Sequence, residues 1–196
     1  AMIKNNQREP RVCTKDFKDR LVVITGTTSG IGYHTAKKFA SRGAKLLCIN
    51  RNEKKSEALK NEIEKEYGIN CEYIIADLSS LKDVYSTAEK LGKINIPIDV
   101  LIHNAGIYLT RKELTAEGFD KVFIVNHLSS FMLNILLYQK LKSQGKARII
   151  LVNSEGHRFA AWGLRLDDLN WKKRRYSGLK SYGSAKLAQL LSMLLL

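Results

Sequence analysis

The sequence predicts a doubly wound α/β fold with a mostly parallel sheet, and two observations support this prediction. Short apolar runs alternate with longer stretches of helical character from about residue 20 onward. The chain has 196 residues, of which 44% are hydrophobic, and this length suits one globular domain with its own core. Strand–helix alternation of this kind builds βαβ units with right-handed connections between parallel strands.

Five apolar runs predict the strands of the sheet. Each run is short and apolar on both faces, as expected for parallel strands that are covered by helices on either side. The runs are residues 21–24, 46–49, 73–76, 100–102 and 149–152.

The stretches around these runs predict five helices, at residues 31–42, 53–67, 80–91, 119–143 and 178–196. Gly43 and Gly68 stand just past the first two helices, where a left-handed cap is expected. Ser79 or Ser80 is placed to cap the start of the third helix.

Residues 1–18 are polar and aperiodic, so we expect a flexible N-terminal arm before one domain over residues 19–196. No uninterrupted apolar run reaches the roughly 18 residues of a membrane span, and the polar, basic start does not resemble a secretory signal. Cys13, Cys48 and Cys71 lack the spacing of a metal site or a disulfide framework. We therefore expect no metal and a reducing compartment, with the cytoplasm as the default location.

The chain is strongly basic. Lys and Arg number 33 against 19 Asp and Glu, which gives a net charge of +14. This excess favours anionic partners, whether nucleic acid, acidic lipid headgroups or a phosphate-bearing cofactor, and charge alone does not choose among them. The densest basic run, residues 172–175, lacks interleaved aromatic side chains, so we predict a solvated segment rather than a nucleic-acid site.

A glycine-rich bend lies where the first strand ends and the first helix begins. Gly26 allows the tight turn off the strand, and Gly30 lets backbone N–H groups approach a diphosphate without an intervening Cβ. Gly32 lets the helix lie close to the sheet. The N-terminus of the helix would then face the phosphates with unpaired N–H groups and the positive end of its dipole.

The pattern TGxxxGIG at residues 25–32 resembles that of the short-chain dehydrogenase/reductase superfamily, and further motifs follow in the family's order. They are Asp77 and Leu78, then His103 to Gly106 (the family's NNAG with His in first place), then Asn126, Ser154 and the YxxxK pair Tyr182 and Lys186. The resemblance covers about residues 19–192 and implies a Rossmann-type dinucleotide-binding domain.

The bend and the resemblance together predict the cofactor-binding residues. They are Gly26, Thr28, Ser29, Gly30, Ile31, Gly32, Arg51, Asp77, Leu78, Asn104, Ala105, Gly106, Tyr182 and Lys186. At the end of the second strand, Asn50 stands where an acidic residue would bind the ribose of NAD, and Arg51 can pair with a 2′-phosphate. We therefore favour NADP(H) over NAD(H), although the family's basic residue before the second glycine is absent, because Ser29 occupies that position.

Tyr182 and Lys186 are four residues apart, so a helix places both on one face. An ammonium beside a phenol favours the phenolate, and a phenol tuned in this way can give a proton to a carbonyl oxygen or take one from an alcohol. The resemblance implies that Ser154 holds the substrate oxygen, that Lys186 also binds the nicotinamide ribose, and that Asn126 anchors a water relay to Lys186. These four are the predicted catalytic residues.

The segment between Ser154 and Tyr182 is longer than in many members of the superfamily. Three segments most resemble the retinol dehydrogenase and WW-domain oxidoreductase branch: this insert, residues 125–128 and residues 154–159. That resemblance implies a lipophilic alcohol or carbonyl substrate. The other histidines carry no predicted function: we expect His34 and His127 on helix surfaces.

Members of the family continue with two more strands and a Pro-Gly motif. The prolines of this chain are Pro10 and Pro97, so we expect a C-terminally incomplete fold with doubtful activity in the 196-residue form. The apolar residues 190–196 predict burial by further chain or by a partner, and the resemblance implies a homodimer or homotetramer.

Three functional hypotheses follow from these residues. The first is an NADP(H)-dependent oxidoreductase that acts on a small-molecule alcohol or carbonyl. The alternative is a non-catalytic nucleotide-binding or scaffold protein on the same fold, which His103 and the missing end favour. A basic nucleic-acid binder is the third, and it depends on charge alone. The presence of Tyr182, Lys186, Ser154 and Asn126 favours the first hypothesis.

Overall fold

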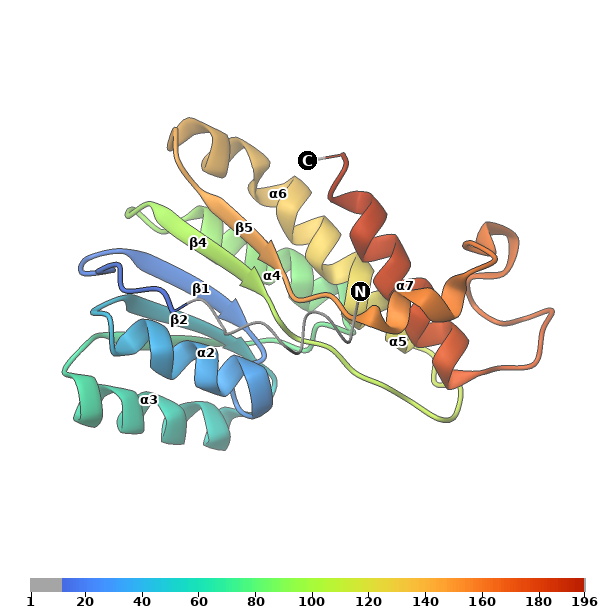
Figure 1. Cartoon of the computed structure of the whole chain (residues 1–196), viewed down its shortest axis with the longest axis horizontal. Helices are drawn as coiled ribbons and strands as arrows, with labels where there is room; N and C mark the ends of the chain where they lie inside the picture. Colours follow the sequence, from blue (N-terminus) through green and yellow to red (C-terminus); the bar gives the residue numbers. More distant parts are fainter. Residues whose placement is uncertain (1–11, 196) are drawn as a thin grey trace.

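The computed structural model describes residues 12–195 and contains one five-stranded parallel sheet (Figure 1). The strands are β1 (Leu21–Thr25), β2 (Lys45–Asn50), β3 (Cys71–Ile75), β4 (Ile98–His103) and β5 (Arg148–Leu151). Their order is β3-β2-β1-β4-β5. Strands β2 and β3 are therefore added on one side of β1, and β4 and β5 are added on its other side. The predicted doubly wound fold is confirmed.

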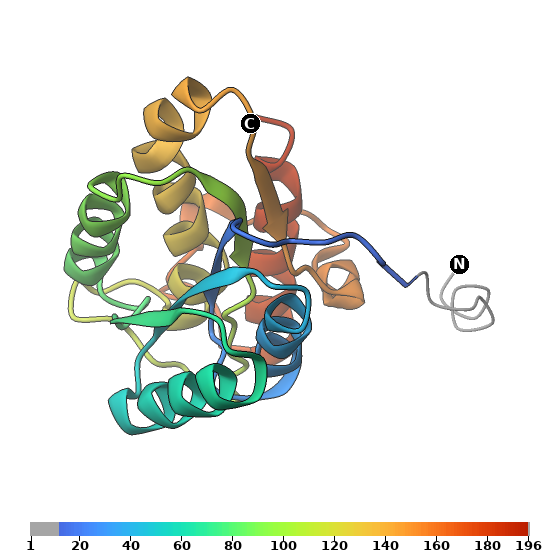
Figure 2. The ribbon, with the colours of Figure 1, turned by 90° about the vertical axis from the view of Figure 1, so that its left-hand side faces the viewer.

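Helices cover both faces of the sheet. They are α2 (Gly30–Ala40), α3 (Glu53–Tyr67), α4 (Leu81–Gly92), α5 (Lys121–Phe123), α6 (Ser129–Ser143) and α7 (Gly178–Ser192). A turn of π-helix, η1 (Ile124–Leu128), joins α5 to α6, and two short 3₁₀ turns, η2 (Glu155–Ala160) and η3 (Leu166–Asp168), precede α7. Figure 2 shows α2 and α3 on one side of the sheet and α4 and α6 on the other.

Each face of the sheet has its own hydrophobic core. On one face, Ala36 of α2 and Ile63 of α3 pack against Val22 and Ile24 of β1. On the other, residues of α4 and α6 pack with Val23 of β1 and its neighbours. All of β1 is buried because both layers cover it, which explains why its sequence is apolar at every position.

The predicted helix caps are found where the sequence signals place them, with one shift. Gly68 is the left-handed cap of α3 at φ 64°, and Ser80 accepts a hydrogen bond from the N–H of Asp83 at the start of α4. Gly43 has φ 81°, but α2 ends earlier, with Ser41 as its cap residue. The last helix ends at Ser192 rather than running to the end of the chain, and β3 begins at Cys71, two residues before the predicted strand.

The longest continuous helix runs from Lys121 to Ser143 and has the length and composition of a candidate membrane span. Half of its most apolar 18-residue window is buried inside the fold, so it also fits the description of a core helix. The helix itself was predicted, at residues 119–143, but not as a candidate span: the prediction counted only uninterrupted apolar runs, and polar residues are spaced among the apolar ones here.

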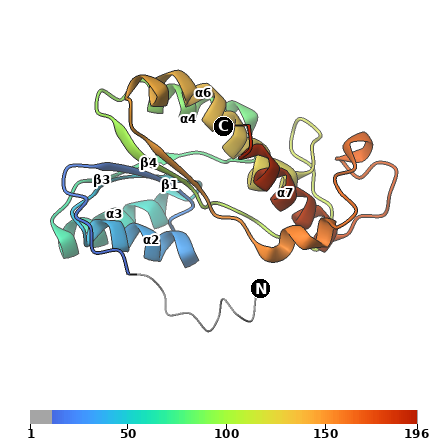
Figure 3. The same cartoon turned by 45° about the horizontal axis from the view of Figure 1, so that its top comes forward.

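The predicted N-terminal arm falls partly outside the described residues, which begin at Val12. The ring of Phe17 packs edge-on against Phe39 of α2 at 4.9 Å, and the N–H of Phe17 donates to the carbonyl of Arg42. The insert between β5 and α7 is folded as η2, η3 and connecting loops, and Figure 3 shows it extending beyond the N-terminal end of α7.

Candidate active site

The reversal of strand order between β1 and β4 leaves a crevice at the carboxyl ends of these strands, which is where open α/β sheets bind ligands. The loop after β1 carries the glycine bend, and the loop after β4 carries Asn104 to Ile107. Two adjoining hollows occupy this edge, and we name them the cofactor cleft and the catalytic cleft below. A separate hollow of about 530 Å³ lies at the opposite edge, around residues 14–19 and 41–45, away from every predicted site residue.

The glycines of the bend have the geometry that the sequence predicts. Gly26 has φ +72°, and a Cβ there would lie 2.9 Å from the α-carbon of Ala105. A Cβ on Gly32 would lie 2.0 Å from the carbonyl oxygen of Gly26, so only glycine permits this approach of α2 to the bend. Gly30 has φ +58° and open space where its Cβ would point. The bend therefore presents bare backbone toward the crevice.

The N-terminus of α2 lacks a capping side chain, since Ser29 forms no such hydrogen bond, and no acidic residue lies in the first turn. By contrast, Asn52, Ser80 and Ser177 cap α3, α4 and α7 with their side chains. The unpaired N–H groups and the positive dipole end of α2 suit an anion such as a diphosphate.

Asn50 lies at the base of the cofactor cleft, and its side chain is bonded to the glycine bend. Its Oδ1 accepts from the backbone N–H of Thr27 at 2.8 Å, and its Nδ2 donates to Thr27 Oγ1 at 2.9 Å. Both residues are buried. Asn50 therefore fixes the glycine bend to the end of β2, a role that the sequence pattern did not reveal.

The cofactor cleft has a volume of about 350 Å³ and gathers most of the predicted cofactor-binding residues. They are Gly26, Thr28, Ser29, Ile31, Arg51, Asp77, Leu78, Asn104, Ala105 and Gly106. Arg51 is exposed, and within residues 12–195 it forms no ion pair. Its guanidinium is thus available at the end of the cleft that lies beside Asp77.

Asn104 joins the loop after β4 to the glycine bend. Its Nδ2 donates to the carbonyl oxygens of Thr25 at 3.0 Å and Gly26 at 2.8 Å. Thr25 Oγ1 in turn accepts from the backbone N–H groups of Asn104 and Ala105. The side chain of Asn104 is therefore engaged with the protein, and its contribution to the cleft is the position that it gives to both loops.

Asn126 lies in the π-helical turn, a feature that often marks functional sites in helices. Its side chain is completely buried and is paired with the backbone of Ile107: the N–H of Ile107 donates to Oδ1 at 2.7 Å, and Nδ2 donates to the carbonyl oxygen at 2.8 Å. Asn126 therefore holds the loop between the two clefts. The predicted water relay from Asn126 to Lys186 stays a prediction.

The catalytic cleft, of about 550 Å³, brings together Ser154, Tyr182 and Lys186. It shares Ile31, Asn104, Gly106 and Ile107 with the cofactor cleft, so the two are continuous. Asn126 lies behind the shared wall and lines neither cleft.

Gly156 sets the distance between Ser154 and Tyr182. A Cβ at Gly156 would lie 2.6 Å from Cε1 of Tyr182 and 3.2 Å from Oγ of Ser154. The ring and the hydroxyl therefore converge on one point, and any larger side chain would separate them. Gly156 was not among the predicted site residues, because a lone glycine two residues after a serine carries no distinctive signal.

Lys186 is buried, with 4% of its surface exposed, and lies 5.9 Å from the centre of the Tyr182 ring. Nζ donates to the carbonyl oxygen of Val152 at 2.8 Å and to Oε1 of Gln189 at 3.3 Å, which leaves one of its three N–H donors for a ligand. Burial lowers the pKa of Lys186 to about 8. The ammonium thus predominates at neutral pH.

The amide side chains of Gln189 and Asn153 support this lysine. Asn153 Nδ2 donates to the carbonyl oxygen of Lys186 at 2.9 Å and to Oε1 of Gln189 at 3.1 Å. The sequence reasoning missed both residues. The available signals were a glutamine three residues after Lys186, on the same helix face, and an asparagine directly before Ser154.

Ser154 caps the start of the 3₁₀ turn η2, and its Oγ accepts from the backbone N–H of Gly156 at 3.0 Å. This bond leaves the hydroxyl hydrogen free to donate to a substrate oxygen. The carbonyl oxygen of Ser154 bonds to Nδ1 of His157 at 2.8 Å, which satisfies that histidine within the loop.

The expected surface position of His127 is wrong, because the side chain is buried between the rings of Phe123 and Phe131. The π-helical turn adds a residue to the helix and rotates His127 inward relative to a regular helix. Burial lowers the pKa of His127 and of His103 to about 4 each, and His103 Nε2 bonds to Oδ1 of Asn134 at 2.7 Å. Both imidazoles are neutral at pH 7.

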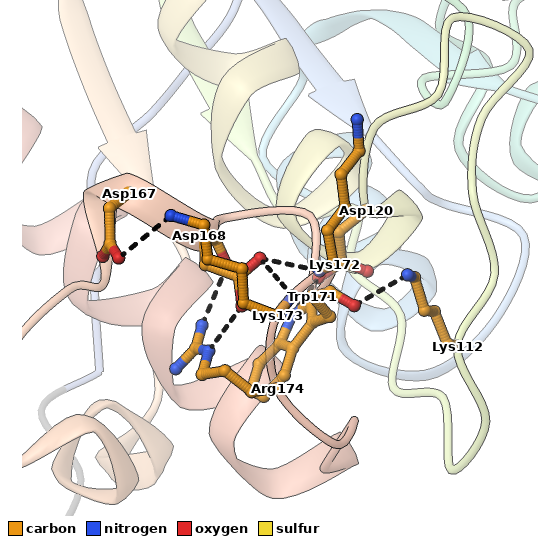
Figure 4. Close-up of polar contacts among 8 residues, drawn as sticks. All are labelled: Lys112, Asp120, Asp167, Asp168, Trp171, Lys172, Lys173 and Arg174. Carbon is orange, nitrogen blue, oxygen red and sulfur yellow. Dashed lines mark hydrogen bonds and ion pairs between the residues drawn. The ribbon is translucent and has the colours of Figure 1, made fainter.

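Two buried carboxylates order the insert: Asp120 attaches it to the domain, and Asp168 holds its own loop together. Asp120 accepts from Ser181 Oγ at 2.6 Å and from Trp171 Nε1 at 3.2 Å, and thereby links the residue before Tyr182 to the insert. Asp168 accepts from Arg174, whose guanidinium also stacks on Trp171 at 4.1 Å (Figure 4). The predicted solvated run 172–175 is therefore only partly solvated. Burial raises the pKa of Asp120.

Comparisons with known proteins agree with this geometry. A family model described as short chain dehydrogenase matches residues 20–163. Human retinol dehydrogenase 13 is 37% identical over 175 residues, which cover 88% of this chain and 52% of that protein. Human WW domain-containing oxidoreductase is 36% identical over 183 residues, which cover 90% of this chain and 44% of that protein. The chain spans about half the length of these curated relatives.

Solved structures show the same fold. An uncharacterized protein from Mycobacterium paratuberculosis matches with a TM-score of 0.75 and 36% identity, over 90% of this chain and 60% of that one. A short-chain dehydrogenase from Sphingobium yanoikuyae, solved in complex with NADPH, matches with a TM-score of 0.72 and 26% identity, over 88% of this chain and 62% of that one.

Proposed function

This chain belongs to the short-chain dehydrogenase family, and from that membership we propose that it transfers a hydride between NADP(H) and an alcohol or carbonyl compound. The observation that carries the proposal is the continuity of the two clefts. The bare backbone of the bend opens into one, and Ser154, Tyr182 and Lys186 converge in the other.

The cofactor cleft fits a dinucleotide. Gly26, Thr28 and Ser29 line the cleft beside the uncapped N-terminus of α2, which is suited to the diphosphate, and Asp77 and Leu78 line the end where the adenine would lie. Arg51 provides a guanidinium for a 2′-phosphate. The residue at the end of β2 is the neutral Asn50, so no carboxylate stands at that position to repel the phosphate. These features support NADP(H) over NAD(H).

Proton transfer is the part of the reaction that this chain's own residues perform. Reduction of a carbonyl adds a hydride to carbon, which is the chemistry that a bound nicotinamide supplies, and a proton to oxygen. The Tyr182 hydroxyl gives that proton, and Ser154 Oγ donates a hydrogen bond to the same oxygen. The nearby Lys186 ammonium stabilises the negative charge that develops on the phenol oxygen. In the oxidation direction the same groups take the proton from the alcohol.

The substrate is proposed to be lipophilic. Beyond the reacting groups, the catalytic cleft is lined by Tyr108, Phe159 and Leu179, which offer apolar surface. Two relatives are named for lipophilic alcohols, retinol dehydrogenase 13 and polyprenol dehydrogenase. We further propose a cytoplasmic location. We also propose a homo-oligomer, in keeping with the exposed apolar side chains of α6 and α7.

The test is isotope transfer with the chain itself. NADPH labelled with deuterium at the transferable position is mixed with a panel of long-chain and short-chain aldehydes and ketones. The proposal predicts NADPH binding by fluorescence titration and deuterium in the product alcohol, with preference for the long-chain compounds. NADPH binding without any labelled product would overturn the proposed enzyme activity and leave a nucleotide-binding protein. Absence of NADPH binding would overturn both the enzyme activity and the proposed cofactor.

A further inference from the structure

The insert between β5 and α7 carries exposed apolar side chains, two of which lie outside both clefts. Trp162 has 88% of its surface exposed, Leu166 has 74% and Phe159 has 51%. Trp162 and Leu166 line neither the cofactor cleft nor the catalytic cleft. Side chains of this size normally bury most of their surface, so a group of three on one projecting segment marks an interaction site.

Cations surround these apolar side chains. Phe159, Trp162, Arg165 and Lys180 line one shallow hollow of about 200 Å³, which places the apolar and basic side chains on a common surface. We name Phe159, Trp162, Arg165, Leu166 and Lys180 the insert tip. Figure 1 shows the insert projecting from the body of the domain beyond α7.

The carboxylates of the insert are already neutralised. Glu155 pairs with Arg158, Asp167 with Lys173, and Asp168 with Arg174. Within the described part of the chain, the remaining insert cations, Arg165, Lys172 and Arg175, form no ion pair, and neither does Lys180 in the first turn of α7. The tip therefore presents uncompensated positive charge beside its apolar side chains.

We propose that the insert tip docks this protein on the surface of an anionic lipid bilayer. Tryptophan favours the membrane–water interface, where its ring is apolar and its N–H stays hydrated. Arg165 and Lys180 would lie against the acidic headgroups, whose negative surface potential attracts basic side chains. A second copy of the chain fits less well, because the same unpaired cations would then face one another.

Docking would place the catalytic cleft beside the bilayer, since Phe159 lines both the hollow at the tip and that cleft. A lipophilic substrate could then enter directly from the membrane. This consequence depends on the proposed function, whereas the docking itself does not.

Tryptophan fluorescence offers a selective readout of docking. The chain has two tryptophans, and Trp171 is buried with 5% exposed, so a change on vesicle binding reports Trp162. Phosphatidylcholine vesicles with about one-third phosphatidylserine should bind the protein at least about 10-fold more tightly than phosphatidylcholine alone. Binding should shift the emission to shorter wavelength, and brominated lipids should quench it.

Two variants and two controls test whether vesicle binding depends on the insert tip or on the surface in general. Trp162→Ala should weaken vesicle binding about fivefold or more, and the double change Arg165→Glu with Lys180→Glu should weaken it about 10-fold or more. Matched controls on α4 are Tyr85→Ala, which removes another half-exposed aromatic ring, and Lys90→Glu, which reverses another exposed charge. Both controls should bind vesicles with less than about a twofold change.

Three results would overturn the docking proposal. They are equal binding to neutral and anionic vesicles, unchanged binding of both tip variants, and a lower mass by light scattering when Trp162 is replaced, which would assign the tip to a contact between copies. NADPH titration of the same variants should give the wild-type affinity, so failure of docking is distinguished from failure of the cofactor site.

Discussion

Asn126 pairs with the backbone of Ile107 through both atoms of its amide, with an N–H donated in each direction. The asparagine side chain thus supplies the hydrogen-bond partners that a neighbouring strand would otherwise give to the backbone of Ile107. The loop forms the wall shared by the two clefts, so this pair connects the π-helical turn to the position of cofactor and substrate.

Asn126→Asp tests that connection. The carboxylate keeps an acceptor for the N–H of Ile107 but faces the carbonyl oxygen with a second acceptor, so we expect a loss of about 1–3 kcal/mol in the free energy of unfolding. NADPH affinity should fall as the loop loosens. Asn52→Asp is the matched control, because Asp and Asn cap a helix equally well and this residue caps α3. Urea unfolding and NADPH titration measure both effects, and equal behaviour of the two variants would contradict this role.

The close approach of α2 to the glycine bend requires glycine at position 32. Gly32→Ala would place a Cβ 2.0 Å from the carbonyl oxygen of Gly26, so α2 must move away from the bend. We expect a destabilisation of about 1–3 kcal/mol and at least about a 10-fold loss of NADPH affinity. Gly92→Ala, with nothing within 4 Å of its Cβ at the end of α4, should be neutral or stabilising by up to about 1 kcal/mol. Normal NADPH affinity in the Gly32 variant would contradict the predicted packing.

Arg51 makes a prediction about cofactor choice. Arg51→Ala should raise the dissociation constant of NADPH by about 10-fold or more, because hydrogen bonds to charged groups contribute about 1.5–3 kcal/mol, and should leave that of NADH nearly unchanged. Lys54→Ala removes an exposed charge from the first turn of α3 and serves as the control for general electrostatics. Parallel weakening of both cofactors by the Arg51 variant, or tighter binding of NADH by wild type, would refute the assignment.

The burial of Lys186 predicts a dependence of stability on pH. Its pKa is about 8 in the folded chain and about 10.4 in an unfolded one, so between these values the unfolded chain binds more protons and stability rises with pH. The unfolding free energy of wild type relative to Lys186→Met should therefore increase from pH 8 to pH 10, by on the order of 2–3 kcal/mol, and stay level below about pH 7. Urea unfolding at several pH values measures this difference. A constant difference across the range would show that the ammonium is well solvated.

Much of the fold was predictable because its signals are local. A strand such as β1 is buried on both faces and therefore apolar throughout, and the glycine bend requires residues that tolerate positive φ or the absence of a Cβ. The start of β3 was missed because Glu72 interrupts the apolar run, although Cys71 pairs in register with Leu46 of β2.

The site was predictable in its members but not in its internal bonds. Tyr182 and Lys186 share a helix face by spacing alone, whereas the contacts of Asn50 with Thr27 and of Asn126 with Ile107 join segments that only the tertiary fold brings together. The burial of His127 depends on a π-helical turn. A prediction that assumes the regular spacing of an α-helix cannot detect such a turn.

The central claim is that the Tyr182 hydroxyl delivers the proton beside a docked NADP(H). Tyr182→Phe removes only that hydroxyl and keeps the ring against Gly156. Its direct test is the rate of carbonyl-dependent NADPH oxidation by wild type and variant, each with its NADPH dissociation constant. We predict measurable turnover by wild type, and for the variant a rate lower by at least about 100-fold with NADPH affinity within about threefold. A variant that oxidises NADPH as fast as wild type, or a wild type that binds NADPH but reduces no carbonyl, would contradict it.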